Sequence, residues 1–416
     1  MIKMIESIKG TRDILPPESE LWRSAEAVAR GIFAKSGYGE IRTPIIEDSA
    51  LFIRGVGKDT DIIQKQMYSF TDQGQRNICL RPEATASVVR AYIEHNLHKT
   101  ESIVKLFYCG TMYRSEKPQA GRQREFTQIG VEVLGSYSPY SDCEIIVLLD
   151  DILKALHVGD YQFKINSLGC EKDKEKFKGY LKQSIKKDVK KMCEDCQRRY
   201  ASNILRILDC KNEQCRTILE SLDIKHDYLC EECAADFNKI TDTLKNENIN
   251  FKKDPFLVRG LDYYTKVVFE VTAKGLGSQD AIAAGGRYNN LVKELGGPQT
   301  GACGFAIGVE RLMAVAACDK IYQEKPLDLF LVCMNDKASQ EAFYILHKLR
   351  LRGISCDMDY STKSLKAQMR YADKIKAGFV IVIGENELTS RQGMLKNMKT
   401  GDQKQITLDK IAESLC

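Results

Sequence analysis

The chain has 416 residues, more than one compact core of ordinary size holds, so we expect two or three domains. Its 62 basic and 57 acidic residues nearly cancel to a formal charge of +5, so any nucleic-acid-binding surface must be local. No apolar run is long enough to cross a bilayer, and the first ten residues lack the apolar region and cleavage site of a secretory signal. These features exclude a membrane-spanning protein and predict a soluble protein of the cytoplasm.

Apolar periodicity in the first part of the chain predicts helices alternating with short strands. The predicted helices cover residues 18–36, 81–96 and 142–156. The predicted strands cover residues 40–46, 66–71, 77–80 and 161–168. Two further runs, 102–113 and 124–134, flank a polar connector that contains Pro118 and Gly121, which indicates a β-hairpin with a long loop.

The composition changes after Gly169, where a lysine-rich helical pattern precedes a stretch crowded with cysteines. We interpret residues 171–250 as a helical insertion. Strand character returns at 256–258 and 265–271, followed by glycine-rich turns and a helix near 309–317. From residue 326 the pattern is β-α-β-α-β, with elements at 327–333, 339–352, 355–359, 365–377 and 379–383. This order predicts a small α/β domain with its own core.

Charged residues stand on both arms of the predicted hairpin. Arg114 and Glu116 end the first arm, and Gln128 and Glu132 lie on the second. Because neighbouring antiparallel strands direct alternate side chains to the same face, Arg114, Gln128 and Glu132 could line one pocket. Arginine suits a carboxylate or phosphate, and the acid and amide suit an ammonium or imidazolium group. A solvated sheet face with ordinary ion pairs is the alternative.

Two other peptides combine charge with turn or aromatic residues. Leu80–Thr85 places Glu83 and Thr85 in the first turn of a helix, where an acid is also favoured by the helix dipole alone. Leu257–Tyr264 places Arg259 and Asp262 on either side of Gly260 and ends in two tyrosines. Such charges need partners or a ligand when they are buried. A core strand with an internal ion pair is the alternative for this second peptide.

Two glycine-rich peptides, Ala283–Tyr288 and Gly301–Arg311, each carry an arginine after the glycines. Glycines allow a flat base to approach the backbone, and Arg311 could stack on that base or hold a polyphosphate. Ordinary loops are the alternative, since glycine-rich turns are common.

The 15 cysteines are odd in number and no secretory signal precedes them, which favours reduced thiols or a metal site over disulfides. Cys193-x-x-Cys196 and Cys230-x-x-Cys233 have zinc-ligand spacing, and Cys210 and Cys215 lie between them. We hypothesise one structural zinc, with packing of free cysteines as the alternative. The lysines before this stretch, with Arg198 and Arg199, either contact RNA phosphates or form a solvated helix face.

These peptides resemble the motifs of a known family. Arg114-x-Glu116 in a hairpin resembles motif 2 of the class II aminoacyl-tRNA synthetases, and Gly304–Arg311 before a helix resembles their motif 3. Tyr38–Pro44 is similar to motif 1, which forms the dimer interface in that family. Leu257–Tyr264 and Ala284–Tyr288 resemble the two signature peptides of the histidyl-tRNA synthetases. The resemblance covers essentially the whole chain.

The resemblance implies an α+β catalytic domain of class II synthetase type, with a mostly antiparallel sheet, over residues 1–325. The helical insertion at 171–250 would interrupt that domain, and residues 326–416 would form a small α/β anticodon-binding domain. The implied activity joins histidine to ATP, with Mg2+, to give histidyl-adenylate, and then transfers histidine to the 3′-terminal ribose of tRNA(His). A homodimer is implied as well.

The resemblance also implies roles for individual residues. The histidine-binding residues would be Glu83, Thr85, Gln128, Glu132, Tyr263 and Tyr264. Arg114 and Arg259 would be catalytic, acting on the α-phosphate, and the ATP-binding residues would be Arg114, Glu116, Arg122 and Arg311. No side-chain nucleophile is expected, because positioned arginines can stabilise the charge that builds on phosphorus. Ala84 and Asn289 depart from the usual family pattern beside these positions.

Three other functions remain open from the sequence. A non-catalytic relative that regulates histidine biosynthesis would resemble the catalytic domain, although such relatives typically lack the C-terminal domain. A class II ligase for threonine or proline is disfavoured by Leu257–Tyr264. A pure RNA-binding module would not need three separate arginine-bearing peptides with flanking glycines.

Overall fold

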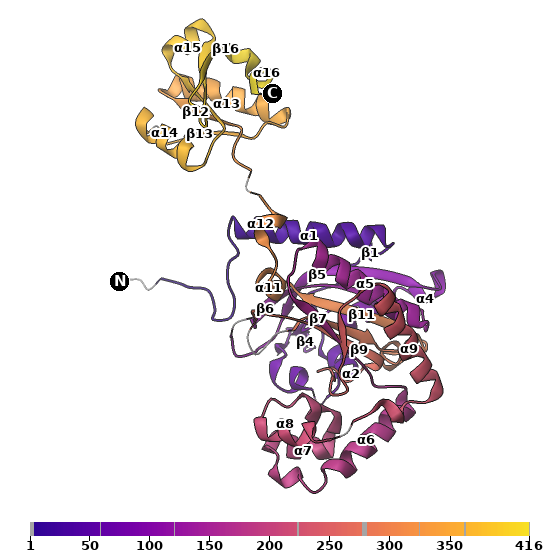
Figure 1. The fold of residues 1–416 in the computed structure, drawn as a ribbon. Coiled ribbons are helices and arrows are strands. Elements are labelled where there is room, and N and C mark those ends of the chain that lie inside the picture. Colours follow the sequence, from indigo (N-terminus) through magenta and orange to yellow (C-terminus); the bar gives the residue numbers. More distant parts are fainter. Residues whose placement is uncertain are drawn as a thin grey trace. The chain divides into compact units, whose positions relative to one another are not determined.

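The computed structural model describes residues 4–415 except 59, 120, 223, 277–280, 324 and 362. The chain forms two compact units, Met1–Tyr322 and Gln323–Cys416 (Figure 1), and each is described by itself. Among the described helices, none combines the length and apolar character needed to span a bilayer.

The first unit is built on an eight-stranded sheet in the order β1-β5-β6-β11-β10-β9-β7-β8. Its strands are Gly39–Glu40 (β1), Val104–Tyr113 (β5), Glu125–Leu134 (β6), Ala302–Gly308 (β11), Ala281–Arg287 (β10), Thr265–Ala273 (β9), Tyr161–Ser167 (β7) and Phe251–Lys253 (β8). All neighbours are antiparallel except the edge pairs β1–β5 and β7–β8. The predicted mostly antiparallel sheet is therefore confirmed.

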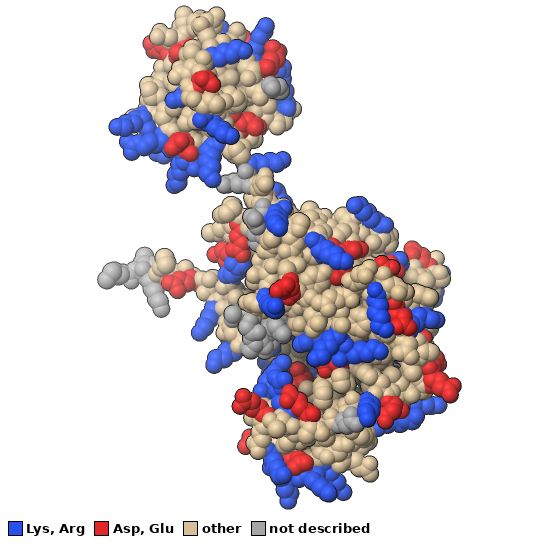
Figure 2. All heavy atoms as spheres, viewed as in Figure 1, with Lys and Arg blue, Asp and Glu red and all other residues tan. Residues whose placement is uncertain are grey.

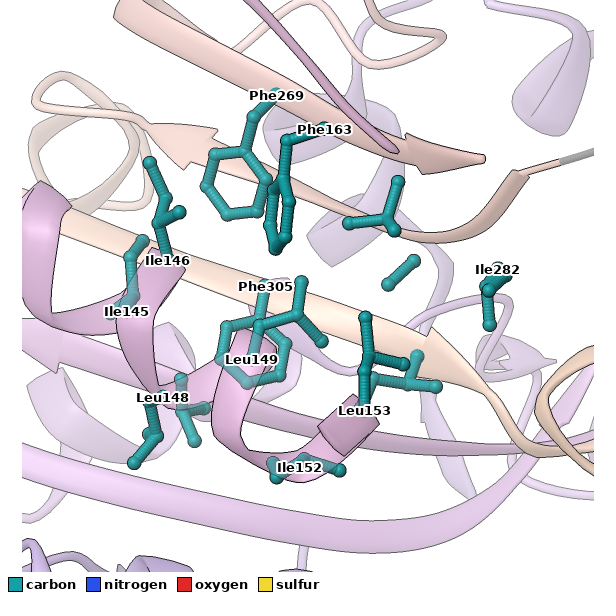
Figure 3. Packing of buried hydrophobic residues seen from close by; sticks show 14 of the residues in the cluster. Ile145, Ile146, Leu148, Leu149, Ile152, Leu153, Phe163, Phe269, Ile282 and Phe305 are labelled. Carbon is teal, nitrogen blue, oxygen red and sulfur yellow. The ribbon is translucent and has the colours of Figure 1, made fainter. Parts of the chain in front are cut away.

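Helices α1 (Glu18–Lys35), α5 (Pro139–Ala155) and α9 (Glu231–Asn246) pack in the main core against the sheet. In α1 the buried residues Trp22, Ala25, Ala29 and Phe33 recur at helical spacing and form one apolar face. Figure 3 shows residues of α5, such as Ile145 and Leu149, beside Phe163, Phe269 and Phe305 of the sheet. Alternate strand residues, among them Ile129, Val131, Phe305 and Ile307, face this core. The residues between them point to the opposite face of the sheet.

A small antiparallel sheet of Ile46–Asp48 (β2), Asn77–Leu80 (β4) and Ser69–Thr71 (β3) lies in the same unit. Asp48 caps α2 (Ser49–Val56) by accepting the Ala50 N–H at 2.8 Å. The remaining elements outside the insertion are Ile62–Gln66 (η1), Thr85–Glu94 (α3), Leu97–Thr100 (α4), Leu291–Glu294 (α10), Val309–Met313 (α11) and Cys318–Ile321 (α12). Helix α3 matters for function because it begins at the peptide that carries Glu83 and Thr85.

The predicted insertion is helical, and its first helices form the lower end of the first unit in Figure 1. Before α9 it contains Glu171–Ile185 (α6), Val189–Lys191 (η2), Glu194–Ser202 (α7), Ile204–Asp209 (η3), Glu213–Glu220 (α8) and His226–Tyr228 (η4). Phe177 and Leu181 of α6 belong to one buried cluster with Leu257, Tyr263 and Tyr288. The insertion therefore shares a core with the peptides that were predicted to carry the chemistry.

The second unit contains a five-stranded sheet in the order β13-β12-β14-β15-β16. Its elements are Leu329–Cys333 (β12), Asp336–Leu351 (α13), Cys356–Met358 (β13), Leu365–Lys374 (α14), Phe379–Ile383 (β14), Glu385–Ser390 (α15), Gln392–Asn397 (β15), Gln403–Thr407 (β16), Leu408–Lys410 (η5) and Ile411–Leu415 (α16). The first three strands are parallel, as the β-α-β-α-β pattern predicts. The hairpin of β15 and β16 was not predicted.

Three local predictions are wrong. Residues 40–46 do not form one strand, because Glu40 ends β1 of the large sheet and Ile46 begins β2 of the small sheet. The segments interpreted as glycine-rich turns are β10 and β11, which lie side by side near the centre of the large sheet. Pairing on both sides outweighs the low strand propensity of glycine there. Residues 256–258 form no strand, because the Leu257 N–H bonds the Asp254 carbonyl at 3.0 Å in a turn.

The arginine of the peptide Ala283–Tyr288 is structural. Arg287 is 1% exposed and forms a bidentate ion pair with Asp142 of α5, at 2.7 Å for the shorter contact. Its remaining N–H groups donate to the Ser136 and Ser138 carbonyls at 2.7 and 2.9 Å and to the Asn289 side chain. Because each donor group has a partner, this arginine holds the end of β10 against α5.

Removing one partner of this buried pair should strongly destabilise the first unit. We expect Asp142→Ala to lower the free energy of unfolding by about 3–5 kcal/mol, because the Arg287 charge would stay buried without its counter-ion. The measurement is urea unfolding followed by the fluorescence of Trp22, the one tryptophan of the chain. Lys274→Ala, which removes the exposed ion pair with Asp160, is the matched control. Equal losses in the two variants would contradict the assigned role of Arg287.

Candidate active site

A pocket opens over the face of the large sheet that the main core leaves free. It contains all the site residues predicted from the sequence, namely Glu83, Thr85, Arg114, Glu116, Arg122, Gln128, Glu132, Arg259, Tyr263, Tyr264 and Arg311. These residues come from widely separated parts of the chain, so the fold is what brings them together. Asp262 does not belong to the pocket, because its carboxylate accepts the Asn203 side-chain amide of the insertion at 2.9 Å.

The floor of the pocket is made by alternate residues of β6 and β11. Gln128 pairs with Gly308 and Glu132 with Gly304 across the two strands. A Cβ at Gly304 would lie 2.0 Å from the Glu132 carboxylate, and a Cβ at Gly130 would lie 2.3 Å from the Tyr108 hydroxyl. Glycine at these two positions therefore lets the acid and the phenol lie flat over the sheet.

Two buried carboxylates form the deep end of the pocket. One oxygen of Glu132 accepts the Thr85 hydroxyl at 2.7 Å, and the other accepts the Tyr288 hydroxyl. The two oxygens of Glu83 accept the backbone N–H groups of Thr85 and Ala86 at 2.8 and 2.9 Å. Glu83 thus caps the start of α3, which is the structural role that the sequence left open for this acid. It also lines the pocket.

Burial raises the pKa of Glu132 to about 8, and burial likewise raises the pKa of Glu83. Each carboxylate lies near the other, which adds like-charge repulsion to the shift of Glu132. A cation placed between them would favour the ionised forms. The deep end is therefore suited to an ammonium or imidazolium group.

Three tyrosines form a wall at this end. The rings of Tyr263 and Tyr264 lie 4.7 Å apart, and Tyr263 meets Tyr288 edge to face at 5.5 Å. The Tyr264 carbonyl accepts the ammonium of Lys174, on α6, at 2.8 Å. A flat, polar ring such as imidazole matches this combination of aromatic faces and hydroxyls.

The other end of the pocket is lined by arginines from the hairpin and from α11. The Arg114 Nε donates to the Pro82 carbonyl at 2.9 Å, and its guanidinium lies 5.2 Å from the centre of the Phe126 ring. Arg122 pairs with Glu116 at 3.3 Å. Arg311 donates to the Gly121 and Ala281 carbonyls, at 2.8 Å each. Burial lowers the pKa of Arg114, but guanidinium groups remain protonated in proteins.

Arg259 approaches the pocket from the Leu257–Tyr264 peptide and pairs with Glu270 of β9. Its Nε is buried and has no hydrogen-bond partner within the described part of the chain, and the same holds for the Gln128 side-chain oxygen. Buried polar atoms are nearly always paired in proteins. These two atoms therefore indicate places where a ligand completes the hydrogen bonding.

Sequence reasoning missed three residues that line the pocket: Tyr108, Tyr288 and Glu310. Glu310 accepts the Thr127 N–H at 2.8 Å, which ties α11 to β6. Tyr288 stands beside Arg287 in a peptide that drew attention for its arginine, although the tyrosine is the residue that reaches the pocket. Tyr108 could have been found from its pairing with Gly130 in the hairpin. A large side chain that lies opposite a glycine can extend over the partner strand.

The cysteines that the sequence suggested as metal ligands lie in the insertion and do not line this pocket. Cys193 and Cys196 meet Cys210 and Cys215, whereas Cys230 and Cys233 meet Cys170 and Asp173. The two C-x-x-C pairs therefore belong to separate groups, and the hypothesis of one structural zinc stays a prediction.

Comparisons with known proteins agree with this geometry. A family model described as histidyl-tRNA synthetase matches residues 10–312, and a model described as anticodon binding domain matches residues 328–415. The chain is 45% identical over 415 residues to the histidine–tRNA ligase of Halothermothrix orenii, covering 99% of both proteins. It is 42% identical to the histidine–tRNA ligase of Natranaerobius thermophilus, with 98% of this chain and 97% of the relative covered.

Solved structures lead to the same family. The crystal structure of apo histidyl-tRNA synthetase from S. aureus superposes with a TM-score of 0.82 at 35% identity, covering 99% of this chain and 100% of that one. Since the matched relatives are covered almost end to end, the likeness includes both compact units. The chain belongs to the histidyl-tRNA synthetase family.

Proposed function

We propose that this chain is a histidine–tRNA ligase. It activates L-histidine with ATP to histidyl-adenylate and pyrophosphate, and then transfers histidine to the 3′-terminal ribose of tRNA(His). The observation that carries the proposal is the continuity of the pocket, in which a cavity of acids and tyrosines opens into a cavity of arginines. The amino acid and the nucleotide phosphates would meet where the two ends join.

Histidine would occupy the deep end, held by Glu83, Thr85, Gln128, Glu132, Tyr263 and Tyr264. Its ammonium would face the two buried carboxylates, and its imidazole would lie along the tyrosine wall. A site built from paired acids and hydroxyls rejects a ligand that cannot reproduce those bonds by orders of magnitude, because buried polar groups would then stay unpaired. This property would separate histidine from apolar amino acids of similar size.

ATP would occupy the arginine end, with Arg114, Glu116, Arg122 and Arg311 as its ligands. The carboxylates of Glu116 and Glu310 line the same end, and oxygen donors of this kind suit a Mg2+ ion that accompanies the phosphates. Such an ion would neutralise phosphate charge. The buried Arg259 Nε has no partner in the described chain and would donate a hydrogen bond to a substrate. The buried side-chain oxygen of Gln128 likewise has none and would accept one.

The chemical step needs charge stabilisation more than proton transfer. Attack of the histidine carboxylate on the α-phosphorus builds negative charge on the equatorial oxygens, and pyrophosphate leaves. Arg114 and Arg259 reach the pocket from different parts of the chain and would neutralise that charge from two directions. Both are held by fixed partners, so little reorganisation accompanies the reaction.

Transfer RNA would contact both compact units. On α14 the exposed side chains of Lys366, Arg370 and Lys374 recur every fourth residue and form one basic stripe. In Figure 2, Lys and Arg side chains gather on the side of the second unit where Figure 1 labels α14. They also gather over the insertion, at the lower end of the first unit. Phosphate contacts from these surfaces would position the RNA without reading its sequence.

A homodimer is part of this proposal. The chain segment after β1, at the edge of the large sheet, exposes Ile45 and Ile46, and Phe70 of the adjacent small sheet is exposed as well. Apolar surface at a sheet edge fits association with a second copy. The cytoplasm, where ATP and transfer RNA are available, is the proposed location.

ATP–pyrophosphate exchange tests the proposed activation step. With each of the twenty amino acids offered separately, we expect histidine alone to support exchange, since no other side chain matches the acids and tyrosines of the deep end. Absence of exchange with histidine would favour the regulatory relative considered above, and exchange with threonine or proline would favour a sister ligase.

Arg259 should be needed for chemistry and not for folding. We expect Arg259→His to lower the exchange rate by about 10²–10³-fold, the usual effect of removing one preorganised charge stabiliser. Thermal unfolding should stay close to the wild-type value because Arg259 is partly exposed and is paired only at its tip. Arg23→His, at a highly exposed arginine of α1, is the control variant. Exchange at the wild-type rate in Arg259→His would remove the residue from the catalytic group.

The protonation of Glu132 gives a test of the histidine end. Because its pKa is raised to about 8, Glu132 should be protonated in the empty protein at pH 7 and should ionise as the pH rises through 8. Histidine should ionise it at pH 7, since the ammonium stabilises the carboxylate and lowers this pKa. Infrared difference spectroscopy would follow the protonated carboxyl band, and Glu132→Gln would assign the band. A band that persists after saturation with histidine would contradict the proposed contact.

A further inference from the structure

We propose that the insertion binds two zinc ions through two separate groups of side chains, a four-cysteine centre and a three-cysteine, one-aspartate centre. Neither centre touches the pocket, so this proposal is independent of the activity. The ligand atoms of each group lie within 4.8 Å of one another.

The first centre consists of Cys193, Cys196, Cys210 and Cys215. A zinc–sulfur bond of about 2.3 Å in a tetrahedron places the sulfurs about 3.8 Å apart. The Sγ atoms of Cys193 and Cys210 are 3.8 Å apart. This pair therefore has the spacing of two ligands in a tetrahedral site, the other sulfurs lie within 4.8 Å, and all four are soft thiols of the kind that zinc accepts.

The backbone builds this centre in the way expected for a metal knuckle. Cys193 precedes α7 in an extended conformation, and Cys196 lies in the first turn, so the helix N-terminus brings both sulfurs together. The Cys193 N–H points at the Cys215 sulfur at 3.2 Å, which stabilises negative charge on that sulfur. Neutral thiols that packed merely as small apolar groups would have no reason to converge on one point.

The second centre has the same construction at two other helix starts. Cys170 and Asp173 stand at the beginning of α6, and Cys230 and Cys233 at the beginning of α9, each pair with two residues between its members. The Asp173 carboxylate accepts the N–H groups of Cys170 and Cys230 at 3.2 and 3.1 Å. Asp173 is completely buried, and it has no ion pair with Lys or Arg among the described residues. These N–H groups already stabilise the carboxylate, and a cation would add a full counter-charge to them.

The local structure supplies the reason for two ions. Among the residues described between α6 and α9, the α-helices are α7 and α8, of 9 and 8 residues, and the rest of the helical structure is short 3-10 segments. Helices of this length are not stable alone in water. The first centre would tie α7 to α8, and the second would tie the start of α6 to the start of α9. Two metal ties would thus reinforce the apolar core that the insertion shares with the Leu257–Tyr264 peptide.

Metal analysis of the full-length protein tests the proposal. Protein purified with a phosphine reductant and without chelators should contain about two zinc ions per chain by mass spectrometry. Cys215→Ser should lose one ion through the first centre, and Cys233→Ser should lose one through the second. Cys79→Ser and Cys356→Ser, at buried cysteines outside the insertion, are matched controls and should keep both.

A second measurement needs no variant. Titrating the wild-type thiols with a mercurial in the presence of a zinc indicator should release about two zinc ions per chain, and reconstitution with Co2+ should give the absorption of tetrahedral cobalt–thiolate sites. If the wild-type protein holds one ion, and Cys215→Ser loses it while Cys233→Ser keeps it, the second centre is overturned. If Cys233→Ser loses that ion and Cys215→Ser keeps it, the first centre is overturned. An absence of metal would overturn both centres, and bound iron in place of zinc would overturn the choice of ion.

Discussion

Burying a charge costs several kcal/mol unless a partner meets it, and the first unit buries charge on both sides of its large sheet. On the side covered by α5, Arg287 and Asp142 are almost completely excluded from solvent and satisfy one another. On the pocket side Glu83 and Glu132 are buried as well, and the partly exposed Arg259 keeps a buried Nε without a partner in the described chain. Arg287, whose donor groups all have partners within the protein, has a structural role. Arg259, whose Nε has no such partner, lies where a ligand would bind.

Side chains along each strand point alternately to the two faces of the sheet, and this alternation separates the structural charges from those of the pocket. Val131 faces the helices while Glu132 faces the pocket, and the same alternation in β11 places Phe305 in the core and Gly304 on the floor. A shift of one residue in the pairing of β6 would exchange these faces. The apolar contacts of α5 with the sheet therefore also fix which residues can meet a substrate.

Much of this could be predicted from the sequence. The hairpin 102–134 and the β-α-β-α-β order of the second unit follow from local patterns, and the fold class is confirmed. The structure gathers every predicted site residue around one pocket, while their individual roles remain proposals. The errors occur where distant contacts decide the outcome. Nothing local identifies the glycines of β10 as a central strand, and the spacing of the cysteines does not show which pairs converge in space.

The contacts of the insertion with the tyrosine wall have a mechanical consequence. Lys174 belongs to the lysine-bearing helix α6, yet its ammonium ends on the carbonyl of Tyr264, and Asn203 of the same insertion holds Asp262 one residue before Tyr263. The insertion is therefore tied directly to the backbone that carries the aromatic rings, by one contact to a main-chain carbonyl and one to a side-chain carboxylate. The position of the tyrosine wall is thus set by the insertion as well as by the sheet below it.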